Sequence, residues 1–227
     1  MAADPRLNED LALALLNRRD LPREVLEDLS KNAVAQHRKV QLAVAMHPRS
    51  PRHVSIPIIR RLYTFELMQM ALFPAVAADV KMAAEETLIG RLKTISSGER
   101  FALAKQSSGR VAAALLLDPE ERIMRAALLN PRMTELLIAK ALKAEEASAV
   151  FVAAVSHHEK WSRRNDIKMA LLAQEHTPFA KILQFAQELP ARMLRDALLN
   201  SRLKPNVKSY LRALVEQRGR SQARRGD

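Results

Sequence analysis

The stretch LLNPRMTELL, residues 128–137, contains a signal that ends one helix and a signal that starts the next. Asn130 is a residue type that tolerates the left-handed conformation often found at helix ends. Pro131 cannot donate the hydrogen bond that continues a helix, and it disfavours a helical residue before it. Thr134 can then cap the next helix, with Glu135 near its positive end. The stretch therefore predicts two helices joined by a short turn.

Variants of this phrase recur along the chain. They are AMHPRSPRHV (45–54), LAQEHTPFAK (172–181), LLNSRLKPNV (198–207) and, more loosely, LLNRRDLPRE (15–24). Two copies place Ser50 or Thr177 directly before a proline, which predicts a capping hydroxyl followed by proline at the first helical position. The predicted helix ends recur roughly every 26 residues, with one interval clearly shorter, and such a period is typical of stacked supersecondary units.

Apolar residues at helical spacing fill the segments between these signals, and strand signals are almost absent. Pro57 should kink or shorten the helix that contains it. Because a single short helix is marginal in water, its apolar face must be covered by neighbouring helices. The expected core includes Leu11, Leu29, Val44, Leu67, Leu103, Leu128, Val152, Leu171 and Leu198. We expect helices at 8–16, 22–31, 38–46, 52–62, 64–72, 77–95, 98–105, 110–117, 120–129, 134–142, 146–156, 163–174, 178–186, 191–200 and 205–217.

The LLNPRMTELL and AMHPRSPRHV units resemble HEAT-like repeats of the leucine-rich-variant type, in which A-x-[NH]-P-x-[ST]-P phrases separate short helices. The resemblance covers most of residues 9–217 and is weakest at 64–117. It implies an all-α fold, an α-solenoid in which antiparallel helix pairs stack into a right-handed superhelix. It also implies that the inner surface binds a partner. The domain prediction is one repeat domain over 1–217, followed by a basic, flexible tail at 218–227.

Composition excludes several classes of protein. The chain has 227 residues, of which 48% are hydrophobic and 27% charged, as in ordinary folded proteins. It has no cysteine, which excludes disulfides and thiolate chemistry, and five glycines leave little room for a phosphate-binding loop. No metalloprotease or hydrolase motif occurs, so we expect no catalytic residue, cofactor or metal. The first residues do not resemble a signal peptide, and no apolar run is long enough for a membrane helix, so we expect a cytoplasmic protein.

Positive charge is concentrated in one part of the sequence. The formal net charge is +12, and no acidic residue occurs between 29 and 65. Arg38 and Lys39 begin a predicted helix, where cations are unfavourable, which suggests that something other than helix stability placed them. The candidate residues for binding an anionic partner are the seven basic residues of this block: Lys31, Arg38, Lys39, Arg49, Arg52, Arg60 and Arg61. The alternative is a solvated surface with no specific partner.

Trp161 is the only tryptophan and lies in HHEKWSRRND, residues 157–166. It is a candidate for stacking on a nucleobase, with Arg163 and Arg164 on phosphates. The alternative is a structural role, in which the indole fills a gap between repeats and its nitrogen donates to a carbonyl.

Three functional hypotheses follow. The first is a non-enzymatic scaffold that binds another protein or a peptide segment through the groove of the solenoid. The second is a nucleic-acid-binding module that uses the basic surface. The third is a DNA glycosylase-like enzyme, because the alkylpurine DNA glycosylases are also basic and HEAT-like. The catalytic motif of that family cannot be placed on any stretch of this chain.

Overall fold

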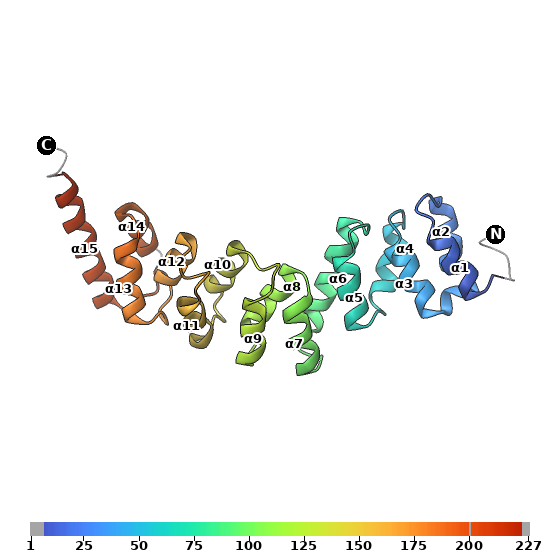
Figure 1. Cartoon of the computed structure of the whole chain (residues 1–227), viewed down its shortest axis with the longest axis horizontal. Coiled ribbons are helices and arrows are strands. Elements are labelled where there is room, and N and C mark those ends of the chain that lie inside the picture. Colours follow the sequence, from blue (N-terminus) through green and yellow to red (C-terminus); the bar gives the residue numbers. More distant parts are fainter. Residues whose placement is uncertain (1–6, 200, 224–227) are drawn as a thin grey trace. The chain divides into compact units, whose positions relative to one another are not determined.

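The computed structural model describes residues 7–199 and 201–223, the last five of these by their backbone only. Fifteen α-helices and two short 3-10 helices account for the described part of the chain, which contains no strand (Figure 1). The contacts divide the protein into two compact units, Met1–Val111 and Ala112–Asp227, with the boundary inside helix α8 (Gly109–Ala114). The expectation of an all-α protein is confirmed. Residues 224–227 of the predicted tail lie outside the described residues.

Unit 1 contains seven complete α-helices that pack mainly on near neighbours in the sequence. Helix α3 packs on α1, α2 and α4, and α6 packs on α4 and α5. Pro57 lies inside α4, which ends at Ile59, before the predicted end. The helices are α1 (Glu9–Leu16), α2 (Arg23–Lys31), α3 (Arg38–Met46), α4 (Arg52–Ile59), α5 (Thr64–Leu72), α6 (Ala78–Arg91) and α7 (Ser97–Gln106), with the 3-10 helix η1 (Ala33–Gln36) after α2.

Unit 2 repeats this kind of packing. Helix α12 contacts α10 and α14 as well as its sequence neighbours α11 and α13, while α9 contacts α11 and α14 contacts α15. The helices are α9 (Glu121–Leu128), α10 (Glu135–Lys143), α11 (Ala149–His157), α12 (Asn165–Leu172), α13 (Phe179–Glu188), α14 (Ala191–Leu199) and α15 (Pro205–Ala223), preceded by the 3-10 helix η2 (Leu115–Leu117). Every predicted helical segment corresponds to one α-helix. The last helix runs beyond residue 217, so the described start of the predicted tail is helical.

The apolar core follows the predicted helical spacing. Leu29, Val44, Leu67 and Leu103 are buried in unit 1, and the core residues predicted for unit 2 are buried as well. The prediction for Leu11 is wrong, because its side chain is 56% exposed. Helix α1 instead buries Ala12 and Leu16, which are four residues apart and so lie on one face.

The turns between helices use side chains rather than left-handed backbone. No described residue outside glycine has a positive φ, so the role predicted for Asn130 is wrong. The Asn130 side chain instead accepts a hydrogen bond from the backbone N–H of Arg132, two residues later, at 2.8 Å. Four other turns contain the same bond, because Asn, Asp and neutral His all offer an acceptor at this reach. The acceptors of those turns are Asn32, His47, Asp118 and His158.

The predicted caps are only partly correct. Thr134 accepts a hydrogen bond from the Leu137 N–H, as predicted, and Ser96 caps α7 in the same way by accepting from the Glu99 N–H. The prediction for Ser50 and Thr177 is wrong, because Pro51 and Pro178 themselves occupy the capping positions. The Thr177 hydroxyl donates to the carbonyl of Leu171, which closes the preceding helix instead of opening the next.

Side chains also connect positions 29 to 33 residues apart, close to the repeat spacing that the sequence predicts. Each donates to a carbonyl in the last turn of an earlier helix or within three residues after it, where backbone acceptors lack a partner within the helix. We call these contacts the repeat ties. They run from His47 to Arg18, from Arg91 to Leu62 and Arg60, from Trp161 to Leu128, from Gln174 to Leu142 and from Arg218 to Ala186.

Candidate functional site

The α2–α4 surface of unit 1 contains two adjoining hollows, of about 700 and about 300 Å³. Residues of α4 line both, and His53, Pro57 and Arg61 are common to the two. We call them the α2–α4 hollows. Helix α4 buries Ile59 and leaves Arg52, His53 and Pro57 exposed, so that these three residues line the hollows.

The floor of these hollows is largely apolar. Ile56 and Pro57 line the larger hollow, and Val44 and Ile58 line the smaller one together with parts of α2 and η1. Pro57 has no N–H and adds no polar group to this floor. Apolar walls with a few polar groups at the edge are typical of sites that bind side chains of a partner.

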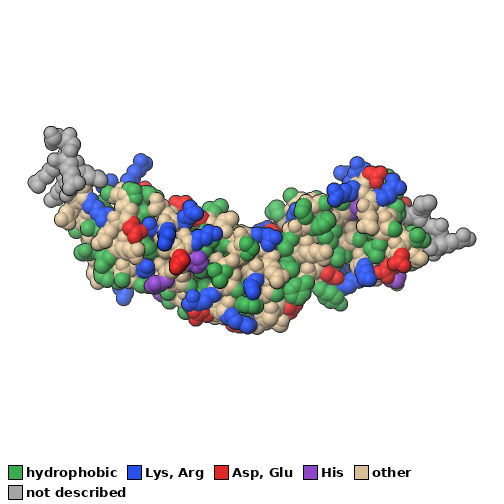
Figure 2. All heavy atoms as spheres, viewed as in Figure 1, with side chains coloured by type: hydrophobic (Ala, Val, Ile, Leu, Met, Phe, Trp, Pro, Cys, Tyr) green, Lys and Arg blue, Asp and Glu red, His purple; other side chains and the backbone are tan. Residues whose placement is uncertain are grey.

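Four of the seven predicted basic residues line the hollows, and all four are exposed: Lys31, Arg52, Arg60 and Arg61. Arg52 lies 3.9 Å from Asp79, a loose contact between exposed groups. Within the described residues, the charged groups of Lys31, Arg60 and Arg61 make no ion pair. Lys and Arg side chains gather over α2 and α4 on the face that Figure 2 shows. The hollows therefore combine an apolar floor with a cationic rim.

Arg38 has a structural role that accounts for its unfavourable place at a helix start. Its guanidinium donates to both carboxylate oxygens of Glu66, at 2.8 and 2.6 Å, and to the carbonyl of Arg61 at 3.2 Å. It also lies 3.2 Å above the ring of Tyr63. These hydrogen bonds, together with one from the Tyr63 N–H, lower the pKa of Glu66.

The other two basic residues of the block, Lys39 and Arg49, are exposed but do not line the hollows. Arg49 donates to the carbonyl of Asp20 at 3.0 Å, beside the tie from His47 to Arg18. The His47 Nδ1 atom accepts from the Arg49 N–H, so the Nε2 atom must carry the proton that is donated to Arg18.

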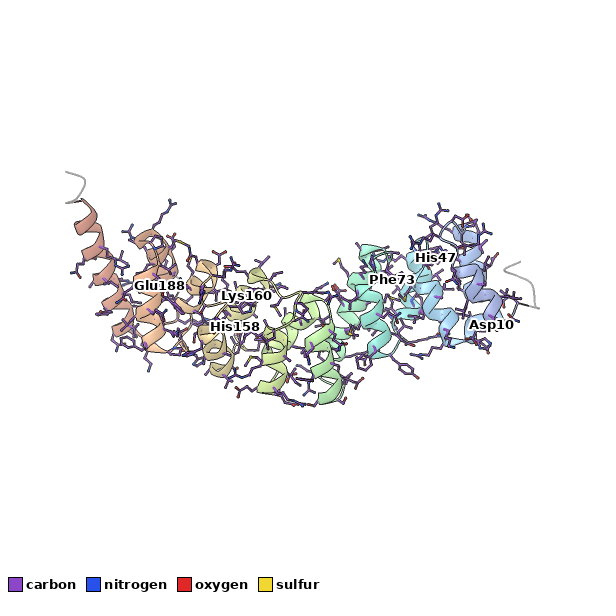
Figure 3. The ribbon with its side chains drawn as sticks, viewed as in Figure 1. Asp10, His47, Phe73, His158, Lys160 and Glu188 are labelled. Atoms are coloured by element: carbon purple, nitrogen blue, oxygen red, sulfur yellow. The ribbon has the colours of Figure 1, made fainter. Side chains whose placement is uncertain are left out.

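Trp161 is only 4% exposed in unit 2, and its indole nitrogen donates to the carbonyl of Leu128 at 3.3 Å. The Lys160 ammonium lies 4.1 Å from the indole ring centre, and the centre of the His158 ring lies 6.1 Å from that of the indole. Figure 3 labels Lys160 and His158 in this part of unit 2. Burial, and then the Lys160 charge, lower the pKa of His158. This geometry agrees with the gap-filling interpretation. Base stacking stays a prediction, and it would require the indole to leave its site.

Arg163 and Arg164 are exposed in the turn before α12, and no ion pair of either is found among the described residues. They belong to unit 2 and are not among the residues that line the α2–α4 hollows of unit 1. A role for them in phosphate binding remains a prediction.

Sequence reasoning missed two hollows of unit 2. One, of about 630 Å³, lies along α9 and α11 and includes Leu129 and Val150. The other, of about 520 Å³, lies along α10, α12 and α14 and includes Leu136. The available signal was an apolar residue directly beside a core position, where helical spacing predicts exposure: Leu129 after Leu128, and Leu136 before Leu137.

Neither a metal-binding cluster nor a similar known protein indicates what the α2–α4 hollows bind. No group of three or more His, Cys, Asp or Glu side chains in the described part of the chain could hold a metal ion. Among those residues, no helix is both long and apolar enough to span a membrane. Comparison of the chain with protein-family models, curated proteins and solved structures finds no match.

Proposed function

We propose that this protein is a non-enzymatic scaffold of HEAT-like, solenoid type that binds an acidic, apolar segment of another protein in the α2–α4 hollows. The observation that carries the proposal is the combination of an apolar floor around Ile56 and Pro57 with the cations of Lys31, Arg60 and Arg61, which make no ion pair within the described residues. The apolar floor would bury the partner's hydrophobic side chains, and the cations would select carboxylates. Packing between near neighbours and ties one repeat apart support the solenoid architecture.

A protein segment fits these hollows better than a nucleic acid. A phosphate backbone would use the cations but leave the apolar floor without a partner, and base stacking needs an aromatic platform. Among the described residues no Phe, Tyr or Trp lines either hollow, and the imidazole of His53, which lines both, has its Nε2 atom 3.3 Å from a Glu27 carboxylate oxygen. An acidic, apolar segment uses both the floor and the rim.

The test is fluorescence anisotropy with four probes: a short Asp/Leu peptide, an Asp/Ser peptide of equal charge, a Lys/Leu peptide and a DNA duplex. We expect the Asp/Leu peptide to bind and the Asp/Ser peptide to bind on the order of tenfold more weakly, because it offers nothing to the floor. The double variant R60Q/R61Q should weaken Asp/Leu binding on the order of tenfold. The matched control K39Q/K93Q removes the same charge from exposed residues outside the hollows and should bind normally.

The salt dependence separates the two classes of partner. Binding of a peptide held partly by apolar contact should weaken only a few-fold between about 50 and about 200 mM salt, whereas DNA held by several phosphates would weaken far more steeply. Tighter binding of DNA than of every peptide, lost in R60Q/R61Q, would support the nucleic-acid hypothesis. Equal affinity of R60Q/R61Q and its control for the Asp/Leu peptide would contradict the proposal.

A further inference from the structure

Helices α10, α12 and α14 form the side walls and floor of the second hollow of unit 2. Figure 1 shows the three helices following one another along this unit, and α12 contacts both of the others. We call this hollow, of about 520 Å³, the unit 2 trough. Its residues are Glu135, Leu136, Ala139, Lys143, Asp166, Met169, Ala170, Ala173, Asp196 and Ala197.

Six of the ten residues that line the trough are apolar. Four alanines from the three helices line it, and their small side chains leave room for a chain to lie against the helices. Leu136 is 78% exposed at the edge, although α10 buries Ile138, Ala141 and Leu142 in the core. Leu136 therefore adds little to the packing of unit 2. Its exposed surface, with that of Met169, is available to a partner.

The charge of the trough is opposite to that of the whole chain. Three carboxylates line it, those of Glu135, Asp166 and Asp196, against one cation, Lys143. In the described structure none of these carboxylates makes an ion pair, although the chain has 37 Lys and Arg residues against 25 Asp and Glu. Glu135 and Asp166 lie in the first turns of α10 and α12, which favours them locally, but Asp196 lies inside α14 without such a reason.

We propose that the unit 2 trough docks a cationic, apolar segment of a protein partner. The partner's Leu- or Met-like side chains would lie on the alanines beside Leu136 and Met169, and its Lys or Arg side chains would reach the three carboxylates. The inference is independent of the proposed function of unit 1, because it concerns other residues and the opposite charge. If both proposals hold, the protein binds one acidic segment in unit 1 and one cationic segment in unit 2.

The same anisotropy assay tests this inference with the Lys/Leu peptide as the probe. The net charge of +12 repels a cationic peptide, so non-specific attraction works against binding and a positive result is informative. We expect a Lys/Ser peptide of equal charge to bind on the order of tenfold more weakly, because it cannot use the apolar lining.

Two pairs of variants separate the two contributions. D166N/D196N should weaken Lys/Leu binding on the order of tenfold, whereas E145Q/E146Q, which removes two exposed carboxylates outside the trough, should change it less than about twofold. L136A should weaken binding about fivefold, whereas L129A, which truncates a residue of similar exposure at 71%, should have no effect.

The controls distinguish this inference from the proposed function. R60Q/R61Q should leave Lys/Leu binding unchanged, and D166N/D196N should leave Asp/Leu binding unchanged. Circular dichroism melting curves check that each variant is folded, and Leu136 and Asp166 are exposed, so folding should persist. The inference is overturned if the Lys/Leu peptide does not bind at millimolar concentration. It is overturned equally if D166N/D196N and L136A bind the peptide as well as their controls do.

Discussion

Replacement of Trp161 tests whether this residue holds unit 2 together or serves a ligand. Its side chain is buried, and its N–H satisfies the carbonyl at the end of α9. An indole of this kind buries about 200 Å² of surface, which at about 25 cal/mol per Å² gives a ceiling of about 5 kcal/mol. Measured Trp-to-Ala losses reach about 3 to 5 kcal/mol, so we expect W161A to lower the free energy of unfolding by about 4 kcal/mol.

W161F gives the sharper comparison, because it keeps an aromatic ring that could still stack on a base. It removes the donor to Leu128, which costs about 1 kcal/mol, and leaves part of the indole volume empty, which costs about 1 kcal/mol more. We therefore expect a loss of about 2 kcal/mol. Urea unfolding followed by circular dichroism at several wavelengths measures it, with F179L at a half-exposed position of the same unit as the control.

One result would refute this reasoning about Trp161. If W161F and W161A both unfold within about 0.5 kcal/mol of the wild type, the indole does not stabilise unit 2. Loss of single-stranded DNA binding in W161A, with binding kept in W161F, would then assign the residue to base stacking. If W161F is destabilised and neither W161F nor the wild type binds DNA, the indole acts only as a repeat tie.

Three further stability predictions can be checked by urea unfolding. Lys168 is only 7% exposed and pairs with Glu188 at 2.6 Å. E188A should lower the free energy of unfolding by about 2 kcal/mol, because it leaves a buried ammonium unpaired. K168M should lower it by under about 1 kcal/mol, because the remaining carboxylate is partly hydrated. The folded pKa of Glu66 lies below its ordinary value of 4.5, so its stabilisation is present above that value and is lost as the pH falls through the folded pKa. The stability difference between wild type and E66Q should therefore shrink as the pH falls below 4.5. H47N should recover about 1 kcal/mol of the loss in H47A, because Asn restores the turn bond but not the tie to Arg18.

The helices could be predicted because their signals are local. Proline, capping residues and apolar spacing act within a few residues of one another, so α3 and α5 begin and end at the predicted positions. The uneven spacing of the predicted helix ends also has a structural cause. The phrase occurs at turns that follow an odd-numbered helix, such as the turn from α3 to α4, and at turns that follow an even-numbered helix, such as the turn from α12 to α13. It therefore marks a helix junction in general rather than one position of the repeat.

The unit 1 site could be predicted only as a region. The absence of acids from 29 to 65 drew attention to seven basic residues, and four of them line the hollows. The sequence could not separate Arg60 and Arg61, whose charges are unpaired in the described structure, from Arg38, whose charge is satisfied by Glu66. That difference depends on a residue 28 positions away, which the local sequence does not indicate.

The repeat ties show why this limit is general in a protein built from short helices. Each helix ends with carbonyls that need donors, and packing brings later helices close enough to supply them. The donor can be His47, Arg91, Trp161 or Gln174, because the carbonyl requires only an N–H at the right place. A residue type such as Arg or Trp in this fold therefore does not by itself indicate a binding role. Side chains left without a structural partner after the ties are formed are the better guide to function, and in the described residues these include the Arg60–Arg61 rim and the carboxylates of the unit 2 trough.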